Sequence, residues 1–192
     1  KTELGLHDKK IVGFIGSISS VSHPIEILIN AFLQLKNQID NIHLLIVGGG
    51  EDFKKIQNKI IELGINDAVS MVGRINPEEI INYYKICDIT VDPVYDDHVA
   101  RARLPLKMFE SWCVGVPFVT SDVGDRNIYL GNPPAGIIAK KDSANELAKA
   151  IYLGLTNNEL RKTIIGNGLT KSQKYYWNTL SSSFSDFLIS RM

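Results

Sequence analysis

The feature that most constrains the fold of this chain is a series of short segments made almost entirely of apolar residues. They span residues 10–15, 42–47, 69–72, 89–91, 116–120 and 136–139. Strands that are apolar on both faces are typical of parallel sheets, because both faces of such a sheet are covered. We therefore predict about six strands in one sheet that is shielded from water on each side.

Amphipathic segments separate these strands and predict helices. Pro24 opens the first of them, and the residues that follow it form an apolar stripe at helical spacing. Asn76-Pro77 has the pattern of a second helix start. Ser143-x-x-Glu146 and Thr156-x-x-Glu159 are capping-box patterns that predict two further helix starts. The polar stretch from residue 92 to 104 is interpreted as a loop.

Strands that alternate with helices predict an α/β, Rossmann-like architecture with helices on both faces of the sheet. The 192 residues suit a single domain, residues 1–192, that closes with an aromatic-rich helical tail from about 175 to 192. The chain begins with Lys1 rather than Met, so we expect a fragment of a longer protein. Such sheets bind ligands beyond the carboxyl ends of their strands, and the residues that follow each strand are therefore the candidates for function.

The segment from Arg101 to Glu110 is the most informative of these. Pro105 predicts a helix start, where unpaired N–H groups and the helix dipole favour a phosphate. Arg101 and Arg103 precede this helix and Lys107 lies in its first turn, so three cations meet at one helix start. Glu110 is three residues after Lys107 and can accept both hydroxyls of a ribose. Together these residues indicate a nucleoside-diphosphate site, although an ordinary Lys107–Glu110 ion pair beside a solvated loop is the alternative interpretation.

Composition excludes some classes of function. Lys+Arg and Asp+Glu are equal at 21 each, a net charge of 0, which gives no electrostatic reason to expect a nucleic-acid partner. Cys87 and Cys113 lie in apolar surroundings without metal-ligand spacing, and we interpret both as buried. Trp112 and Trp177 are interpreted as packing residues.

Two weaker patterns are set aside. Asp96-Asp97-His98 does not have the spacing of a metal-binding Asp-x-Asp, and no metal is expected. Gly48-Gly49-Gly50 follows a strand, but Phe53 occupies the last glycine position of a dinucleotide fingerprint, which disfavours an NAD-dependent redox enzyme.

The segment 105–124, which begins Pro-Leu-Lys-Met-Phe-Glu and ends Asp-Val-Gly, resembles the signature of the retaining GT-B glycosyltransferases of the family-four type, the glycosyl transferases group 1. Segments 12–18, 45–51 and 72–79 resemble the earlier strand and turn blocks of that family in the same order. The pair Tyr176-Trp177 resembles the segment that crosses back to the N-terminal domain. The resemblance covers nearly the whole chain and implies the C-terminal, donor-binding half of a GT-B fold.

The resemblance implies which residues of this chain would contact the nucleotide sugar. Glu110 would hold the ribose hydroxyls, and the backbone around Arg74 and Ile75 would contact the base. Gly16 would allow close approach of the diphosphate, and the N–H groups near Leu106 would face the phosphates or the sugar.

Three positions depart from the family's pattern. The family's usual Arg and Lys after the first strand fall at Ser17 and near His23, and a common additional Glu falls at Ala102. One hypothesis is relocation: Arg101, Arg103 and Lys107 take over the charge of the leaving group, while Ser17 and His23 remain substrate-binding and His23 assists. The rival hypothesis is a noncatalytic nucleotide-sugar-binding or regulatory module.

The implied activity is transfer of a sugar, of the hexosyltransferase type, from a UDP-sugar or GDP-sugar to a saccharide or lipid-linked acceptor with retention of configuration. No cofactor is implied. An N-terminal domain of the same parent protein would supply most of the acceptor site, and the fragment alone would be inactive. Relatives of this kind imply polysaccharide biosynthesis in the cytoplasm, a setting that allows peripheral association of the full-length protein with the inner face of the membrane.

Overall fold

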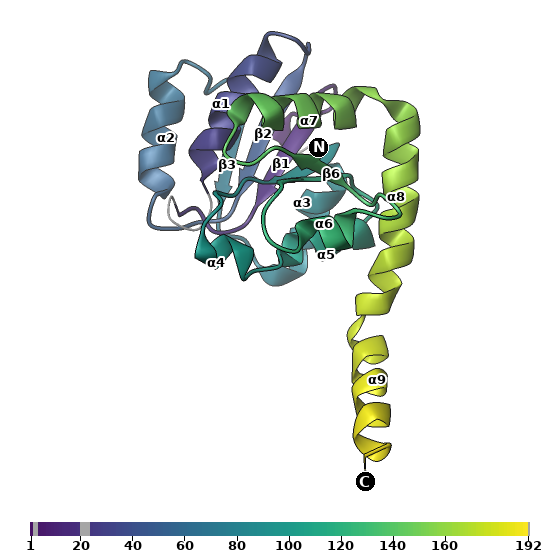
Figure 1. Cartoon of the computed structure of the whole chain (residues 1–192). Helices are drawn as coiled ribbons and strands as arrows, with labels where there is room; N and C mark the ends of the chain where they lie inside the picture. Colours follow the sequence, from purple (N-terminus) through teal and green to yellow (C-terminus); the bar gives the residue numbers. More distant parts are fainter. Residues whose placement is uncertain (2–3, 20–23, 192) are drawn as a thin grey trace.

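Strands β1 (Lys10–Ile15), β2 (Ile42–Val47), β3 (Val69–Gly73), β4 (Ile89–Asp92), β5 (Phe118–Ser121) and β6 (Ile137–Ala139) form one parallel sheet (Figure 1). The computed structural model describes residues 1, 4–19 and 24–191. Within these ranges the strand order is β3-β2-β1-β4-β5-β6. The predicted Rossmann-like sheet is confirmed, and its predicted strands lie within two residues of the observed bounds.

Helices cover both faces of the sheet (Figure 1). One face carries α1 (Ile25–Lys36), α2 (Phe53–Glu62) and α7 (Ala144–Thr156), and the other carries α3 (Ile80–Ile86), α5 (Leu106–Cys113) and α6 (Arg126–Leu130). Successive residues of β1 enter different cores: Val12 and Phe14 pack with α1, whereas Ile11 and Ile15 pack with Tyr84 of α3. The alternating direction of side chains along a strand explains why an uninterrupted apolar run is needed here.

The segment predicted to be a loop contains one turn of helix, α4 (His98–Arg101). The Asp97 side chain accepts a hydrogen bond from the Ala100 N–H at 2.7 Å and so caps this turn. Aspartate at this position satisfies an N–H group that a short helix leaves without a partner. The prediction of an irregular loop from 92 to 104 is therefore wrong for residues 98–101.

The predicted helix starts differ in their outcome. Ser143 accepts a hydrogen bond from the Glu146 N–H as predicted. At α8 (Asn158–Ser172) the cap is Asn157 rather than Thr156, because Thr156 still belongs to α7 and its hydroxyl donates to the Tyr152 carbonyl. Asn76 makes no capping hydrogen bond, and the chain continues as the 3₁₀ turn η2 (Pro77–Glu79) into α3.

The C-terminal segment extends away from the rest of the molecule (Figure 1). The 3₁₀ turn η3 (Gln173–Tyr175) leads into α9 (Trp177–Ile189), which buries none of its side chains. Trp177 is 84% exposed, so its interpretation as a packing residue is wrong, whereas Trp112 is buried and donates to the Ala135 carbonyl at 2.7 Å. Cys87 is buried as predicted, but Cys113, the last residue of α5, is exposed and is not among the residues that this helix buries.

Candidate functional site

A pocket of about 420 Å³ opens at the carboxyl end of the sheet, where β1 and β4 lie side by side. The chain leaves β1 toward β2 and leaves β4 toward β5, so connections diverge at this point. Such a switch point is where an open parallel sheet leaves a crevice. The residues of the pocket that bear on its chemistry are Gly16, Asp92, Arg103, Leu106, Lys107, Glu110 and Arg126.

Helix α5 begins at this pocket. Pro105 occupies its N-cap position in an extended conformation, and no described side chain caps it. The first N–H groups of a helix lack partners within the helix and carry the positive end of its dipole. The start of α5, with Leu106 exposed beside it, is therefore suited to an anion.

Lys107 is held against the wall of the pocket. Its Nζ lies 2.7 Å from Asp92 Oδ1 and 4.8 Å from the centre of the Phe14 ring. A Cβ atom added to Gly16 would lie 3.2 Å from the same Nζ, and Gly16 has a φ of +156°. Glycine at this turn therefore leaves the space that the ammonium group occupies.

Lys107 belongs to a chain of charged contacts at the base of the pocket. Its partner Asp92 also pairs with Arg126, and the sequence analysis singled out neither of these two residues. Asp92 is fully buried at the end of β4, and its Oδ2 lies 3.4 Å from Arg126 Nη2. Asp92 could have been found from the sequence, because it is a charged residue at the end of an apolar strand. Arg126 follows β5 within a polar turn, and nothing local distinguishes it from a solvated arginine.

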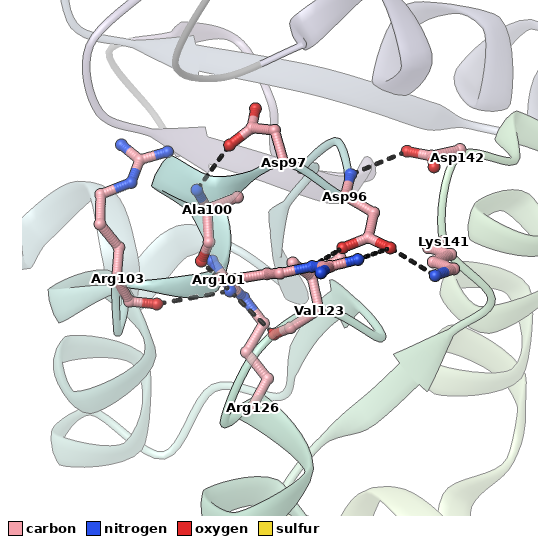
Figure 2. Close-up of polar contacts among 9 residues, drawn as sticks. All are labelled: Asp96, Asp97, Ala100, Arg101, Arg103, Val123, Arg126, Lys141 and Asp142. Carbon is pink, nitrogen blue, oxygen red and sulfur yellow. Dashed lines mark hydrogen bonds and ion pairs between the residues drawn. The ribbon is translucent and has the colours of Figure 1, made fainter.

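Arg126 donates hydrogen bonds to backbone carbonyls in α4 and in its connection to α5 (Figure 2). It is 1% exposed, and its Nη1 donates to the carbonyl oxygens of Ala100, Arg103 and Val123 at 3.1, 3.4 and 3.0 Å. Buried arginine is rare unless its donors find partners of this kind. Its guanidinium therefore fixes the backbone from which Arg103 enters the pocket.

The three cations predicted to act together lie at two different pockets. Figure 2 shows Arg101 and Arg103 pointing away from one another. Arg103 lines the switch-point pocket with Lys107, whereas Arg101 Nε lies 2.5 Å from Asp96 Oδ1. Arg101 is the last residue of α4, whereas Arg103 lies in the connection to α5, and the two side chains leave the backbone in different directions.

Arg101 lines a second, open pocket of about 520 Å³, together with Asp96, Asp122, Lys140 and Lys141. Lys141 also pairs with Asp96. Hydrogen bonds from Arg101 and Lys141 hold the pKa of the Asp96 carboxyl well below its usual range. Arg101 is thus already paired with a carboxylate and does not reach the start of α5.

Glu110 lies at the rim of the switch-point pocket and is exposed. Its Oε2 accepts a hydrogen bond of 2.6 Å from the Tyr84 hydroxyl, whose side chain is buried in α3. Glu110 does not pair with Lys107, since the lysine pairs with Asp92 instead. The ordinary Lys107–Glu110 ion pair that the spacing allowed is therefore not formed.

Three further predicted residues are not among those that line the pocket: Ser17, Arg74 and Ile75. Ser17 is exposed in the turn after β1. Arg74 is exposed beside Gly49, and Ile75 is half-buried against the core of β1 and α3; neither lines the pocket. His23 lies outside the described residues.

Two negative findings apply to the described part of the chain. No group of three or more His, Cys, Asp or Glu side chains there has an arrangement that could hold a metal ion. None of its helices combines the length and apolar content needed to span a bilayer.

Known proteins share this arrangement of elements. The C-terminal domain of LpcC from Francisella tularensis, a glycosyl transferase group 1 family protein, has a TM-score of 0.76 at 17% identity, covering 92% of this chain and 91% of that domain. HepE of Anabaena, solved with UDP and glucose, gives a TM-score of 0.85 at 20% identity, covering 98% of this chain and 50% of that protein. These similarities show that the fold is one Rossmann-like half of a GT-B glycosyltransferase.

Sequence comparison points the same way. The D-inositol 3-phosphate glycosyltransferase of Corynebacterium jeikeium strain K411 is 23% identical over 185 residues, which are 92% of this chain and 43% of that relative. The chain therefore spans less than half the length of this relative. The family model described as glycosyl transferases group 1 matches residues 1–171, and the chain belongs to that family.

Proposed function

We propose that this chain is the donor-binding half of a glycosyltransferase that moves a sugar from a nucleoside diphosphate sugar to an acceptor, with retention of configuration. The observation that carries the proposal is one pocket that combines the uncapped start of α5, the Arg103 and Lys107 side chains, and the Glu110 carboxylate. The cations and the helix start suit a diphosphate, and a carboxylate at the rim suits the neighbouring hydroxyls of a ribose. HepE, half of which has this fold, was solved with UDP and glucose.

In this proposal the protein stabilises the leaving diphosphate. Breaking the bond between the anomeric carbon and the phosphate oxygen leaves the electron pair, and its charge, on the diphosphate. Lys107 and Arg103 both line the pocket, and we propose that the charge develops beside them, since preorganised positive groups lower the barrier to departure. Ser17 and His23 stand where the family usually has its two cations, and in this proposal Arg103 and Lys107 take over their role. Arg126 holds both in place, because it donates to the Arg103 carbonyl and pairs with Asp92, the partner of Lys107.

The rest of the reaction belongs to the whole protein. We propose that a further domain supplies most of the acceptor site, that hexosyl transfer to a saccharide or lipid-linked acceptor requires both halves, and that this chain alone is inactive. The proposed setting is polysaccharide biosynthesis in the cytoplasm, with peripheral association of the whole protein at the membrane.

Calorimetric titration of the chain with UDP and with GDP tests the donor site. We expect one of the two to bind, and Glu110→Ala to weaken that binding by roughly 10- to 100-fold, the value of a hydrogen bond to a charged group. Glu62→Ala removes an exposed carboxylate at the end of α2 and is the matched control. Absence of binding to both nucleotides, or equal affinity in Glu110→Ala, would contradict the proposal.

A second comparison addresses the charge of the leaving group. Sugar transfer by the whole protein should fall strongly in Arg103→Ala and Lys107→Ala and little in Arg101→Ala, because only the first two side chains line the pocket. Transfer that is absent from the whole protein while UDP or GDP still binds would favour the noncatalytic alternative.

A further inference from the structure

Glu110 can hold a ribose in the proposed donor site only while its carboxylate is both charged and oriented. It lies on α5 three residues after Lys107, a spacing at which a lysine normally competes for a carboxylate. Two contacts prevent this. Asp92 holds Lys107 Nζ at 2.7 Å, and the Tyr84 hydroxyl donates to Glu110 Oε2 at 2.6 Å.

The contact from Tyr84 differs in kind from an ion pair. Tyr84 is 1% exposed and is anchored in α3 among the core side chains below β1. Burial and the neighbouring Glu110 carboxylate both raise the pKa of Tyr84 far above its usual value, so the phenol remains a neutral donor. A neutral donor orients the carboxylate without cancelling its charge, which a lysine would do.

The contact also occupies only one of the two oxygens. Within the described part of the chain no hydrogen bond to Glu110 Oε1 is formed, and an ionised carboxylate oxygen has two acceptor positions. A buried tyrosine therefore immobilises one oxygen of an exposed glutamate at the rim of the pocket and leaves the other for a ligand. A glutamate on a surface without such a partner samples several rotamers, and ordering it costs entropy on binding.

We propose that Tyr84 is a positioning residue that sets the preference of this site for a ribose with both neighbouring hydroxyls. This inference rests on the proposed function, because it assigns a task to Glu110 within the same site. Tyr84 acts through Glu110 and does not itself touch the ligand.

The test measures hydroxyl preference rather than activity. UDP and 2′,3′-dideoxy-UDP are titrated into the chain by calorimetry, with GDP and its dideoxy form run in parallel, and the ratio of the two dissociation constants is the readout. We expect Tyr84→Phe to weaken binding of the ribose nucleotide about tenfold and to leave the affinity for the dideoxy nucleotide unchanged within about twofold. The preference for the ribose nucleotide over the dideoxy nucleotide therefore falls by about the same tenfold factor. Tyr83→Phe makes the same chemical change at the preceding position of α3 and should keep the ratio.

A double-mutant cycle separates positioning from a general loss of structure. In the background of Glu110→Gln, the further change Tyr84→Phe should no longer alter the ratio, because the oriented carboxylate is already gone. An unchanged ratio in Tyr84→Phe overturns the inference, and so does an equal loss for both nucleotides, which would mean a merely structural role. Failure of the unaltered chain to bind either ribose nucleotide is a different result, since it overturns the proposed function and the inference with it.

Discussion

Lys107 Nζ lies 2.7 Å from Asp92 Oδ1, and this ion pair joins the first turn of α5 to the end of β4. Asp92 also faces Arg126, so one buried carboxylate is shared by two cations. Counting only these three groups, two positive charges and one negative charge leave the floor of the pocket positive. A lysine compensated in this way is held at a defined position without making the pocket neutral.

The first prediction concerns Lys107 as an anion ligand. Lys107→Met removes the charge but keeps much of the aliphatic stem, and we expect affinity for UDP or GDP, whichever binds, to fall by roughly tenfold or more. The salt dependence of binding should fall as well, because one charge contact is lost. Both quantities are measured by calorimetric titration at two ionic strengths.

Lys141→Met is the matched control for this experiment. Lys141 also pairs with an aspartate, Asp96, but it lies at the second pocket. Equal losses of affinity in the two variants would show that long-range charge, and not a contact in the switch-point pocket, governs binding.

The second prediction concerns the stability that depends on Asp92. Asp92→Asn leaves Arg126 buried without its carboxylate, and removing one partner of a buried pair costs about 3–5 kcal/mol of unfolding free energy. Urea unfolding followed by circular dichroism measures the difference. Asp186→Asn, at an exposed position of α9, should change the unfolding free energy by less than about 0.5 kcal/mol. A value for Asp92→Asn as small as that of the control would mean that the pair adds nothing to the fold.

The third prediction concerns the turn that shapes the pocket from the β2 side. Gly48 has a φ of +132°, and a Cβ added there would lie 1.9 Å from the Gly16 carbonyl oxygen. Gly48→Ala should therefore destabilise the chain by at least about 3 kcal/mol, since the clash is with backbone and the conformation is strained. Gly166→Ala is the control, because its Cβ would meet open space in α8, where alanine is expected to stabilise by up to about 1 kcal/mol. Thermal unfolding distinguishes the two directions, and a stable Gly48→Ala variant would refute the close approach of the two turns.

The fourth prediction is a pH dependence of stability that originates at His43. Burial in β2 lowers the pKa of His43 below 6.5, because the imidazolium is poorly solvated there, and the nearby positive charge of Lys9 acts in the same direction. The unfolded chain then takes up a proton more readily than the folded chain as the pH falls below about 6.5. Stability is therefore retained at neutral pH and lost toward pH 5, by at most about 1.4 kcal/mol per pH unit.

His43→Gln removes this titration and should make the loss of unfolding free energy between pH 7 and pH 5 smaller than in the unaltered chain. His7→Gln, at an exposed position, should leave the pH dependence as it is. If the two variants show the same slope of unfolding free energy against pH, the effect does not originate at His43.

Local patterns in the sequence were sufficient for the architecture. Apolar runs that alternate with amphipathic segments predict a covered parallel sheet, because burial on both faces is a property of each strand by itself. Pro105 likewise marks the start of α5, and the three-residue spacing of Lys107 and Glu110 puts both near one face of that helix. These inferences depend on neighbours within one or two turns of the chain.

Tertiary structure alone decided which charged and polar groups meet around the switch-point pocket. Asp92 and Arg126 are 34 residues apart, and Tyr84 and Glu110 are 26 apart, so their contacts arise only once β4, β5, α3 and α5 are packed together. Arg103 lines the switch-point pocket and Arg101 pairs with Asp96, although the two arginines look equivalent in the sequence. Periodicity reports which side of an element is apolar, whereas the pairing of charges depends on the order and spacing of elements that are distant along the chain.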